Sequence, residues 1–347
     1  MSGSITGFLA LASLLFVVVA TVSWFGVRHL IKMLSERGIV DEPNNRTMHQ
    51  GAVPRGGGLV IVGFLLLGII AAIFIGERPY LFSALGLLLF AWAALSWVDD
   101  KFGLSPFRRG LVQLILASVS VFLLGWVDRV MGWHLGFFGP VLSVFGIVWM
   151  ANLNNFMDGM DGLAASQAIV ASSTLGMWFY FLGDYELALV CLFTVAACYG
   201  FLLLNWHPAK IFMGDVGSIT LGAFYGCMII IAADRHEVPV LSLMLVFAVF
   251  VFDATYTVIR RVIKKEKFWL PHRSHWYQRA GLAGVPHKIV VLLSVCLMVL
   301  SSLFATISLL YRDIITEMIA LTVLILAITA AVIVGIENKA SQVNRKT

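Results

Sequence analysis

The chain has 347 residues, of which 60% are hydrophobic and only 12% are charged, and its mean hydropathy is +0.93. Soluble domains carry about 25% charged residues, so this composition excludes an ordinary soluble protein and indicates an integral membrane protein. No nucleic-acid partner is needed to explain the formal net charge of +5, because the orientation of a membrane protein accounts for its basic residues more simply. We therefore expect a single helical membrane domain over residues 1–347, with the lipid bilayer as its first partner.

Eleven apolar runs are long enough to cross a bilayer, which takes about 20 residues each. They cover residues 5–27, 57–76, 80–98, 110–127, 137–153, 162–182, 186–204, 216–233, 238–258, 289–311 and 315–336. The first run lacks the basic start of a signal peptide, so we expect it to remain as a span. The fifth run is interrupted near its start by Gly139 and Pro140 and ends at Asn152.

The distribution of lysine and arginine predicts the orientation, because these residues accumulate in cytoplasmic loops. Of the 24 basic residues, twenty fall in the tail or in loops that follow odd-numbered runs. The loops after even-numbered runs contain the other four, which are Arg78, Arg129, Arg235 and Arg312. The sequence therefore predicts an all-α protein with about eleven transmembrane helices, a periplasmic amino terminus and a cytoplasmic carboxyl terminus.

The polar clusters all fall in predicted inner loops, at about residues 28–56, 99–109, 154–161, 205–215 and 259–287. Four of them are "WVDDKFG", "NLNNFMDGMDG", "NWHPAKIFMGDVGS" and "LPHRSHWYQRAG". Separate segments that converge on one face are expected of a site that acts on a cytoplasmic substrate at the membrane surface.

Asp99 and Asp100 adjoin the end of the third run. Neighbouring carboxylates repel each other unless a cation or a proton intervenes, and a divalent metal ion is one way to keep both ionised. The alternative is a solvated helix end at which Lys101 is the partner.

The segment "NLNNFMDGMDG" spaces Asn152 and Asn155 by three residues, and likewise Asp158 and Asp161. Each pair shares a face if the helix continues, although the glycines disfavour continuation. Amide and carboxylate oxygens are hard ligands that suit Mg²⁺. The alternative is an ordinary loop built of turn-forming residues.

Asp215 lies between glycines in "GDVGS", immediately before the eighth run. Gly217 and Ser218 then open that helix with free backbone N–H groups, where phosphate can bind. The alternative is a helix cap formed by Asp215 or Ser218.

Two basic segments add candidate phosphate contacts. Arg273, His275 and Arg279 follow the run "RRVIKKEK", which we interpret as an anchor for anionic lipid, and the residues near "PHRSH" suit diphosphate oxygens. The segment "DEPNNRTMHQGAVPRGGG" supplies Arg46, His49 and Arg55, or is a mobile connector. In the ninth run, Asp253 is either functional or simply reaches the surface or pairs with Arg260.

Together these segments resemble the polyprenyl-phosphate N-acetylhexosamine-1-phosphate transferase family, glycosyltransferase family 4. The resemblance runs from "DEPNNRTMHQGAVPRGGG" through "DDKFGLSPFRRGLVQ", "NLNNFMDGMDGLA" and "NWHPAKIFMGDVGS" to "PHRSHWYQRAG". It implies that undecaprenyl phosphate attacks the β-phosphorus of a UDP-N-acetyl sugar and releases UMP. It also implies a Mg²⁺ cofactor, which Mn²⁺ can replace, and a bacterial inner-membrane protein whose active site faces the cytoplasm. A homodimer is compatible with this family.

The resemblance also implies roles for residues that match the motifs. Asn155 and Asp215 correspond to the metal ligands. Asp99 matches a residue proposed as a base for the acceptor phosphate, although an orienting role suits it equally because that phosphate is already largely ionised near pH 7. Asp100 is expected near the metal ion or phosphates, and Arg109 at the acceptor phosphate.

Substrate contacts are implied for a second group of residues. Asp158 and Asp161 match the part of the site that meets the nucleotide and sugar. Arg273 and His275 match the loop that contacts the diphosphate, and we expect Arg55 to bind substrate as well.

The last motif departs from the family pattern at Tyr277, where many members carry another histidine. This departure argues against the peptidoglycan translocase and favours the branch that initiates O-antigen or related lipopolysaccharide glycans. The alternative class is a polytopic transporter with a carboxylate site facing the cytoplasm. A transporter site is expected near the bilayer midplane, whereas these clusters lie at one face.

Overall fold

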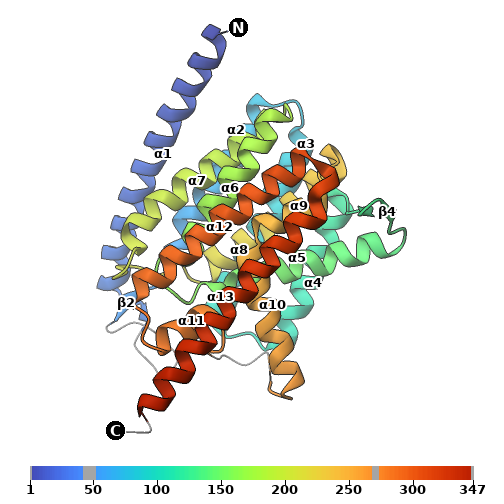
Figure 1. The fold of residues 1–347 in the computed structure, drawn as a ribbon. Helices are drawn as coiled ribbons and strands as arrows, with labels where there is room; N and C mark the ends of the chain where they lie inside the picture. The colour runs from blue at the N-terminus through green and yellow to red at the C-terminus, as the bar shows by residue number, and fades with distance from the viewer. Residues whose placement is uncertain (1, 42–51, 268–272, 345–347) are drawn as a thin grey trace.

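The computed structural model describes residues 2–41, 52–267 and 273–344, and its regular structure is almost entirely helical (Figure 1). The helices are α1 (Ser2–Glu36), α2 (Gly58–Ile75), α3 (Pro79–Phe102), α4 (Pro106–Leu124), α5 (Phe138–Met157), α6 (Leu163–Phe181), α7 (Tyr185–Asn205), α8 (Asp215–His236), α9 (Val240–Val246), α10 (Ala248–Ile263), α11 (Trp276–Leu282), α12 (His287–Leu310) and α13 (Ile315–Asn344), with the 3-10 turn η1 (Arg312–Ile314). Two short antiparallel pairs join β1 (Val40–Asp41) to β2 (Val53–Pro54) and β3 (Arg129–Val130) to β4 (Trp133–His134).

The helices confirm an all-α membrane protein. Within the described residues, nine helices are long and apolar enough to cross a membrane, and the pair α9 and α10 adds a tenth if it is one span. The predicted sixth run is also helical, as α6, but is not among the nine. Helix α1 begins at the top of Figure 1 and α13 ends at the bottom, so the first and last helices extend toward opposite ends of the bundle. The count of eleven spans and the orientation stay predictions.

The apolar run predicted over residues 238–258 is helical but is not one continuous helix. Helices α9 and α10 meet at Phe247 with an angle of 87° between them. A break inside a membrane frees backbone carbonyls, which then need other partners. One of them is satisfied here, because the buried amide of Gln167 donates a hydrogen bond to the Val246 carbonyl at 3.2 Å.

Helix α8 lies at the centre of the bundle, packed against α2, α3, α4 and α5, and nearly all of its residues are buried. Glycines allow two of these helices to approach closely. A Cβ atom on Gly222 would lie 2.3 Å from the Met150 carbonyl of α5, and one on Gly58 would lie 2.3 Å from Gly217 Cα. Small residues at helix interfaces permit this close packing in membranes. The contacts bring the starts of α2 and α8 and the end of α5 together.

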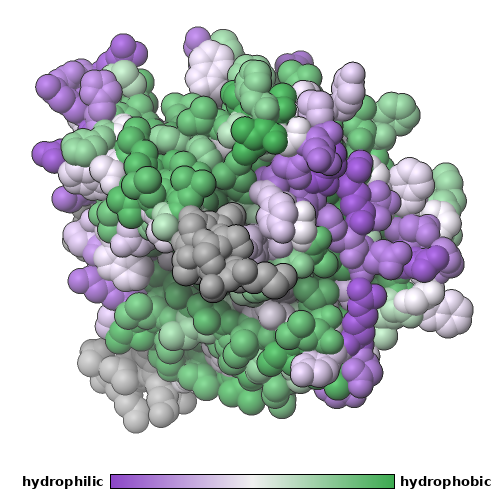
Figure 2. All heavy atoms as spheres, turned by 90° about the horizontal axis from the view of Figure 1, so that it is seen from above, coloured by the Kyte–Doolittle hydropathy of each residue, from purple (hydrophilic) through white to green (hydrophobic). Residues whose placement is uncertain are grey.

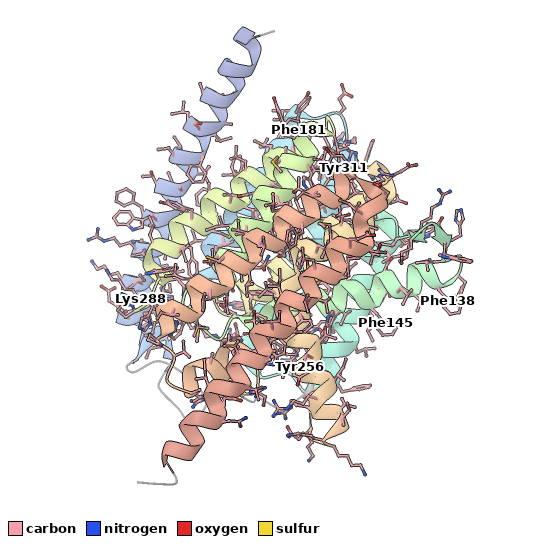
Figure 3. All side chains as sticks on the ribbon, viewed as in Figure 1. Phe138, Phe145, Phe181, Tyr256, Lys288 and Tyr311 are labelled. Carbon is pink, nitrogen blue, oxygen red and sulfur yellow. The ribbon has the colours of Figure 1, made fainter. Side chains whose placement is uncertain are left out.

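The outer surface suits a lipid environment. Large hydrophobic side chains are exposed on many helices, and much of the surface in Figure 2 is hydrophobic. Figure 3 shows Phe138 and Phe145 projecting away from the bundle on α5, and both are well exposed. In water such a surface would be unfavourable, but in a bilayer it is the expected exterior.

The end of the bundle that we predict to be periplasmic holds a buried ion-pair network. The Asp184 carboxylate accepts hydrogen bonds from Arg78 and from His236 Nε2, the latter at 2.7 Å. Arg78 also pairs with Glu186, and Asp184 caps the start of α7 through the Leu187 N–H at 3.1 Å. This network ties the α2–α3 and α6–α7 connections to the end of α8.

A candidate active site at one end of the bundle

A backbone pairing places Arg55 over the start of α8. Arg55 and Phe212 form a parallel bridge, in which the Phe212 N–H donates to the Pro54 carbonyl at 2.9 Å. The close approach of Gly58 and Gly217 continues this contact into α2 and α8. Segments that are more than 150 residues apart in the chain are thus locked together beside Asp215.

Four polar side chains from different elements meet at this point. The guanidinium of Arg55 pairs with Asp215 and lies 3.5 Å from Asp100 Oδ1. The Asn155 amide donates to Asp215 Oδ1 at 3.0 Å and to Ser218 Oγ at 3.2 Å. The structure therefore brings together the two predicted metal ligands, Asn155 and Asp215, with Asp100 and Arg55.

The oxygen donors here have the chemistry that Mg²⁺ requires. Asp100 and Asp215 supply carboxylates, and Asn155 can present its amide oxygen if the amide rotates by about 180°, an orientation assigned from hydrogen bonding. Arg55 lies against both carboxylates and supplies positive charge to them. The residues fit a magnesium ion whose remaining ligands come from water and substrate.

The partners of Asp99 differ from those of Asp100. Its buried carboxylate accepts hydrogen bonds from the Leu104 N–H at 2.8 Å and from Arg109 Nη1 at 3.2 Å. The alternative partner Lys101 instead places its ammonium over the Trp97 ring, 5.0 Å from the centroid. Asp99 therefore closes the turn between α3 and α4 and orients Arg109.

Asp158 and Asp161 do not share a helix face, because α5 ends at Met157. Asp158 lies near Arg55 and Asp215, and burial raises the pKa of its carboxyl to about 8 despite the lowering effect of Arg55. Asp161 is buried and faces the loop between α7 and α8, where His207 Nδ1 lies 2.8 Å from its Oδ2 atom. The two carboxylates thus belong to different surroundings.

Asp253 anchors the loop that carries His275. Its buried carboxylate accepts the Trp276 N–H at 2.9 Å and lies 3.2 Å from His275 Nδ1. Asp253 therefore does not reach the surface and does not pair with Arg260. These were the two alternatives to a functional role that the sequence left open. His275 is only 3% exposed, so its ring faces the interior, while Arg273 lies half-buried two residues earlier.

Tyr277 connects this loop to the end of α5. Its hydroxyl donates to the Phe156 carbonyl at 3.0 Å, and the absence of a side chain on Gly159 leaves room for it. In the sequence, Tyr277 was only a departure from a family motif, and its contact with α5 had no sequence signal. Arg279 points elsewhere and forms an ion pair with Glu337 of α13.

The remaining candidates are easily placed. Arg46 and His49 lie outside the described residues. Asn152 donates to Gln113 Oε1 at 2.8 Å, which links α5 to α4. Sequence reasoning missed Gln113, and it also missed His207, although "NWHPAK" stood inside a quoted motif.

The chain has sequence relatives among known proteins. Residues 81–233 match the sequence profile described as Glycosyl transferase family 4. The chain is 32% identical over 266 residues to a probable undecaprenyl-phosphate N-acetylglucosaminyl 1-phosphate transferase of Bacillus subtilis (strain 168), covering 74% of this chain and 73% of that protein. It is 28% identical to the undecaprenyl-phosphate alpha-N-acetylglucosaminyl 1-phosphate transferase of Escherichia coli (strain K12), covering 85% and 83%. It is also 30% identical to a phospho-N-acetylmuramoyl-pentapeptide-transferase of Moorella thermoacetica, covering 73% and 82%.

The fold and the site define a multi-pass membrane protein with a polar, carboxylate-rich site at one end of its helix bundle. The chain belongs to glycosyl transferase family 4, and this confirms the resemblance seen in its motifs. Its relatives are transferases of phosphosugars, and they lend no support to the transporter alternative.

Proposed function

We propose that the protein transfers N-acetylglucosamine 1-phosphate, or a related N-acetylhexosamine 1-phosphate, from a UDP-sugar to undecaprenyl phosphate. The observation that carries this proposal is the meeting of Arg55, Asp100, Asn155 and Asp215, because a phosphoryl transfer needs cations and carboxylates in fixed positions. The names of the similar proteins support the choice of acceptor and sugar.

In the proposed reaction, an oxygen of undecaprenyl phosphate forms a bond to the β-phosphorus of the UDP-sugar. The bond between that phosphorus and the bridging oxygen breaks, and UMP leaves with the bridging oxygen. Both reactants are anions, so the protein contributes mainly by positioning them and by neutralising charge.

Within this reaction, Arg109 is proposed to hold the acceptor phosphate. Asp99 keeps the Arg109 guanidinium in place through its contact at 3.2 Å and is itself occupied by the Leu104 N–H. The acceptor phosphate has a second pKa near 6 and needs no base at neutral pH. These contacts favour the orienting role of Asp99 over proton removal.

Asp215, Asn155 and Asp100 are proposed to hold Mg²⁺, with Mn²⁺ as a substitute. The ion would neutralise diphosphate charge when bound. Arg55 lies against Asp100 and Asp215 and would contact the diphosphate, while Asp158 and Asp161 would meet the nucleotide and sugar. Arg273 and His275 are proposed to form the wall of the diphosphate site.

The product would be an undecaprenyl diphosphate sugar, the first lipid-linked intermediate of a surface glycan such as O-antigen. We propose that the protein works in the bacterial inner membrane with its site at the cytoplasmic face. The basic residues concentrated on that predicted side support this orientation.

The test uses purified full-length protein, undecaprenyl phosphate, Mg²⁺ and either UDP-N-acetylglucosamine or UDP-N-acetylgalactosamine. UMP release and a lipid-linked sugar are measured together. Asp215→Asn is expected to lower kcat by about 100-fold while helicity and thermal unfolding stay near wild type. Asp128→Asn, in an exposed pair with His134, is the matched control and should retain activity.

Two results would overturn the assignment. Folded wild-type protein that releases no UMP with either sugar excludes the proposed reaction for these substrates. Full activity of Asp215→Asn removes Asp215 from the site.

A further inference from the structure

Asp161, His207 and His287 form a cluster that the proposed reaction does not fully use. They come from the loop after α5, the loop between α7 and α8, and the first residue of α12. In the part of the chain that the structure describes, this is the one group of three histidine, cysteine or acidic residues whose ligand atoms all lie within 4.8 Å of one another. Lys288, labelled in Figure 3 at the start of α12, marks its place in the fold.

The geometry points to a second metal site in this cluster, for Zn²⁺ or a similar transition-metal ion. Two imidazoles and one carboxylate are a ligand set that binds Zn²⁺ and leaves a fourth position for water. Magnesium instead prefers oxygen ligands, such as those around Asp215. The cluster and the Asp215 group therefore differ in the metal that each selects.

The ligands are held by surrounding hydrogen bonds, as metal ligands usually are. Asp161 is 8% exposed and accepts the Ala209 N–H at 3.1 Å. Asn205 accepts the Gly162 N–H at 2.9 Å and donates to the Ile211 carbonyl at 2.8 Å, which fixes both loops. The backbone positions of Asp161 and His207 are thus set before any ion binds.

One ring nitrogen of His287 lacks a hydrogen-bond partner. Its Nε2 atom is buried and has no hydrogen-bond partner among the described residues. A buried polar atom without a partner carries a free-energy cost, so a ligand that satisfies it is favoured. A metal ion bound by this nitrogen would remove the cost.

Metal binding requires a rearrangement of the rings. The rings of His207 and His287 stack with centroids 4.1 Å apart and planes 14° apart, and His207 Nδ1 is paired with Asp161. A metal ion lies in the plane of each imidazole that binds it, so one ring must turn out of the stack. His287 also contacts Asp161, through a hydrogen bond to the Asp161 backbone, so its Nε2 atom is the ring nitrogen that remains for a metal ion.

The site has a consequence that rests on the proposed function. Asp161 is proposed to meet the nucleotide, and a bound Zn²⁺ would occupy its carboxylate. Zinc would then raise the KM for the UDP-sugar, whereas Mg²⁺ would not. Metal binding itself does not depend on that function.

The direct test titrates Co²⁺ into untagged, chelator-treated full-length protein in the presence of excess Mg²⁺. Visible absorption of Co²⁺ reports nitrogen and oxygen ligation, and calorimetry with Zn²⁺ gives the affinity. We expect one ion per chain, with affinity lowered by about tenfold or more in His207→Gln and in His287→Gln. Glutamine keeps hydrogen-bonding capacity at these positions but is a weak ligand for Zn²⁺.

Two controls separate this site from others. His134→Gln changes the exposed histidine that pairs with Asp128 at the other end of the bundle, and Asp215→Asn changes the oxygen site; both should bind Co²⁺ as the wild type does. Wild-type protein without a Co²⁺ spectrum, or binding that folded His207→Gln and His287→Gln leave unchanged, overturns the inference. Inactive protein that still binds Co²⁺ through these histidines would defeat only the proposed function.

Discussion

Asp99 and Asp100 are adjacent in the chain, yet their carboxylates have different partners. Asp99 binds Arg109 and closes the turn after α3, whereas Asp100 lies beside Arg55. The "DD" motif predicted that both residues belong to one site, but their division of labour depends on Arg55, which lies 45 residues earlier. A pairwise contact of this kind leaves no pattern in the local sequence.

The contact between Tyr277 and Gly159 allows the packing of α11 against the end of α5 to be tested with one pair of residues. A Cβ atom on Gly159 would lie 2.2 Å from the Tyr277 hydroxyl oxygen but 3.2 Å from Cζ. We expect Gly159→Ala to cost about 2 kcal/mol of stability and to lower activity, since it pushes α11 away from α5. Adding Tyr277→Phe removes the clashing oxygen, so the double variant should be more stable than Gly159→Ala alone. Additive losses in thermal unfolding would contradict this reading.

Asp158 predicts a pH dependence of substrate binding. Burial raises the pKa of its carboxyl to about 8, so the group is mostly neutral at pH 7 and gains a negative charge above pH 8. That charge would repel the diphosphate of the UDP-sugar, and we expect KM to rise severalfold between pH 7 and pH 9. Steady-state kinetics of Asp158→Asn should lack this rise. The same rise in the variant would assign it to another group.

Helices α5 and α8 position the metal-ligand candidates through their packing. Gly222 allows α8 to touch the α5 backbone, and one helical turn before it Ser218 contacts Asn155. The break between α9 and α10 matters equally, because it directs α10 and Asp253 toward α11. Hydropathy detects such helices but not the distance between their axes.

Gly222→Ala tests this packing. The added Cβ would lie 2.3 Å from a backbone oxygen that cannot move freely, so the helices must separate. We expect a loss of about 2 kcal/mol in stability and a larger loss in kcat, because Asn155 moves away from Asp215. Gly146→Ala, on α5 with no atom within 4 Å of the added Cβ, is the control and should keep wild-type activity without losing stability. Wild-type activity of Gly222→Ala would contradict the proposed link.

The ion-pair network around Asp184, at the end of the bundle away from Arg55, predicts that the protein loses stability in acid. Burial alone would raise the pKa of Asp184, but hydrogen bonds from His236 and Arg78 outweigh it and lower that pKa well below the ordinary range. Its contribution to stability is therefore complete above the ordinary carboxyl pKa near 4 and is lost as the pH falls below that value. Asp184→Asn should cost about 3 kcal/mol at pH 7 in detergent unfolding. The difference from wild type should shrink below pH 4; a constant difference would exclude this ionic origin.

For the whole molecule, the apolar exterior suits a bundle that crosses the bilayer, with the polar site near one membrane surface. The basic residues predict that the end with Arg55 and α11 faces the cytoplasm and that the β3–β4 hairpin faces outward. The site would then meet its nucleotide substrate from the cytoplasm and its lipid substrate from the membrane.

Cysteine labelling checks this orientation. Cys191, Cys198 and Cys227 are buried, so Cys296→Ser removes the one exposed thiol among the described residues. In that background, we expect Trp133→Cys to react with an impermeant maleimide in intact spheroplasts. Lys265→Cys should react only after the membrane is opened. The reverse pattern would invert the predicted topology.

Composition and the length of apolar runs by themselves determined the class of protein and nearly every helix, because burial in lipid imposes long apolar runs that can be read locally. The motifs likewise drew attention to Asp100, Asn155 and Asp215, which the structure brings together beside Arg55. Only the tertiary structure decided which polar groups meet, as in the pairing of Asp161 with His207. It also decided where a helix bends, as at Phe247. Such contacts depend on helix distances set by packing between remote segments, and no local pattern encodes them.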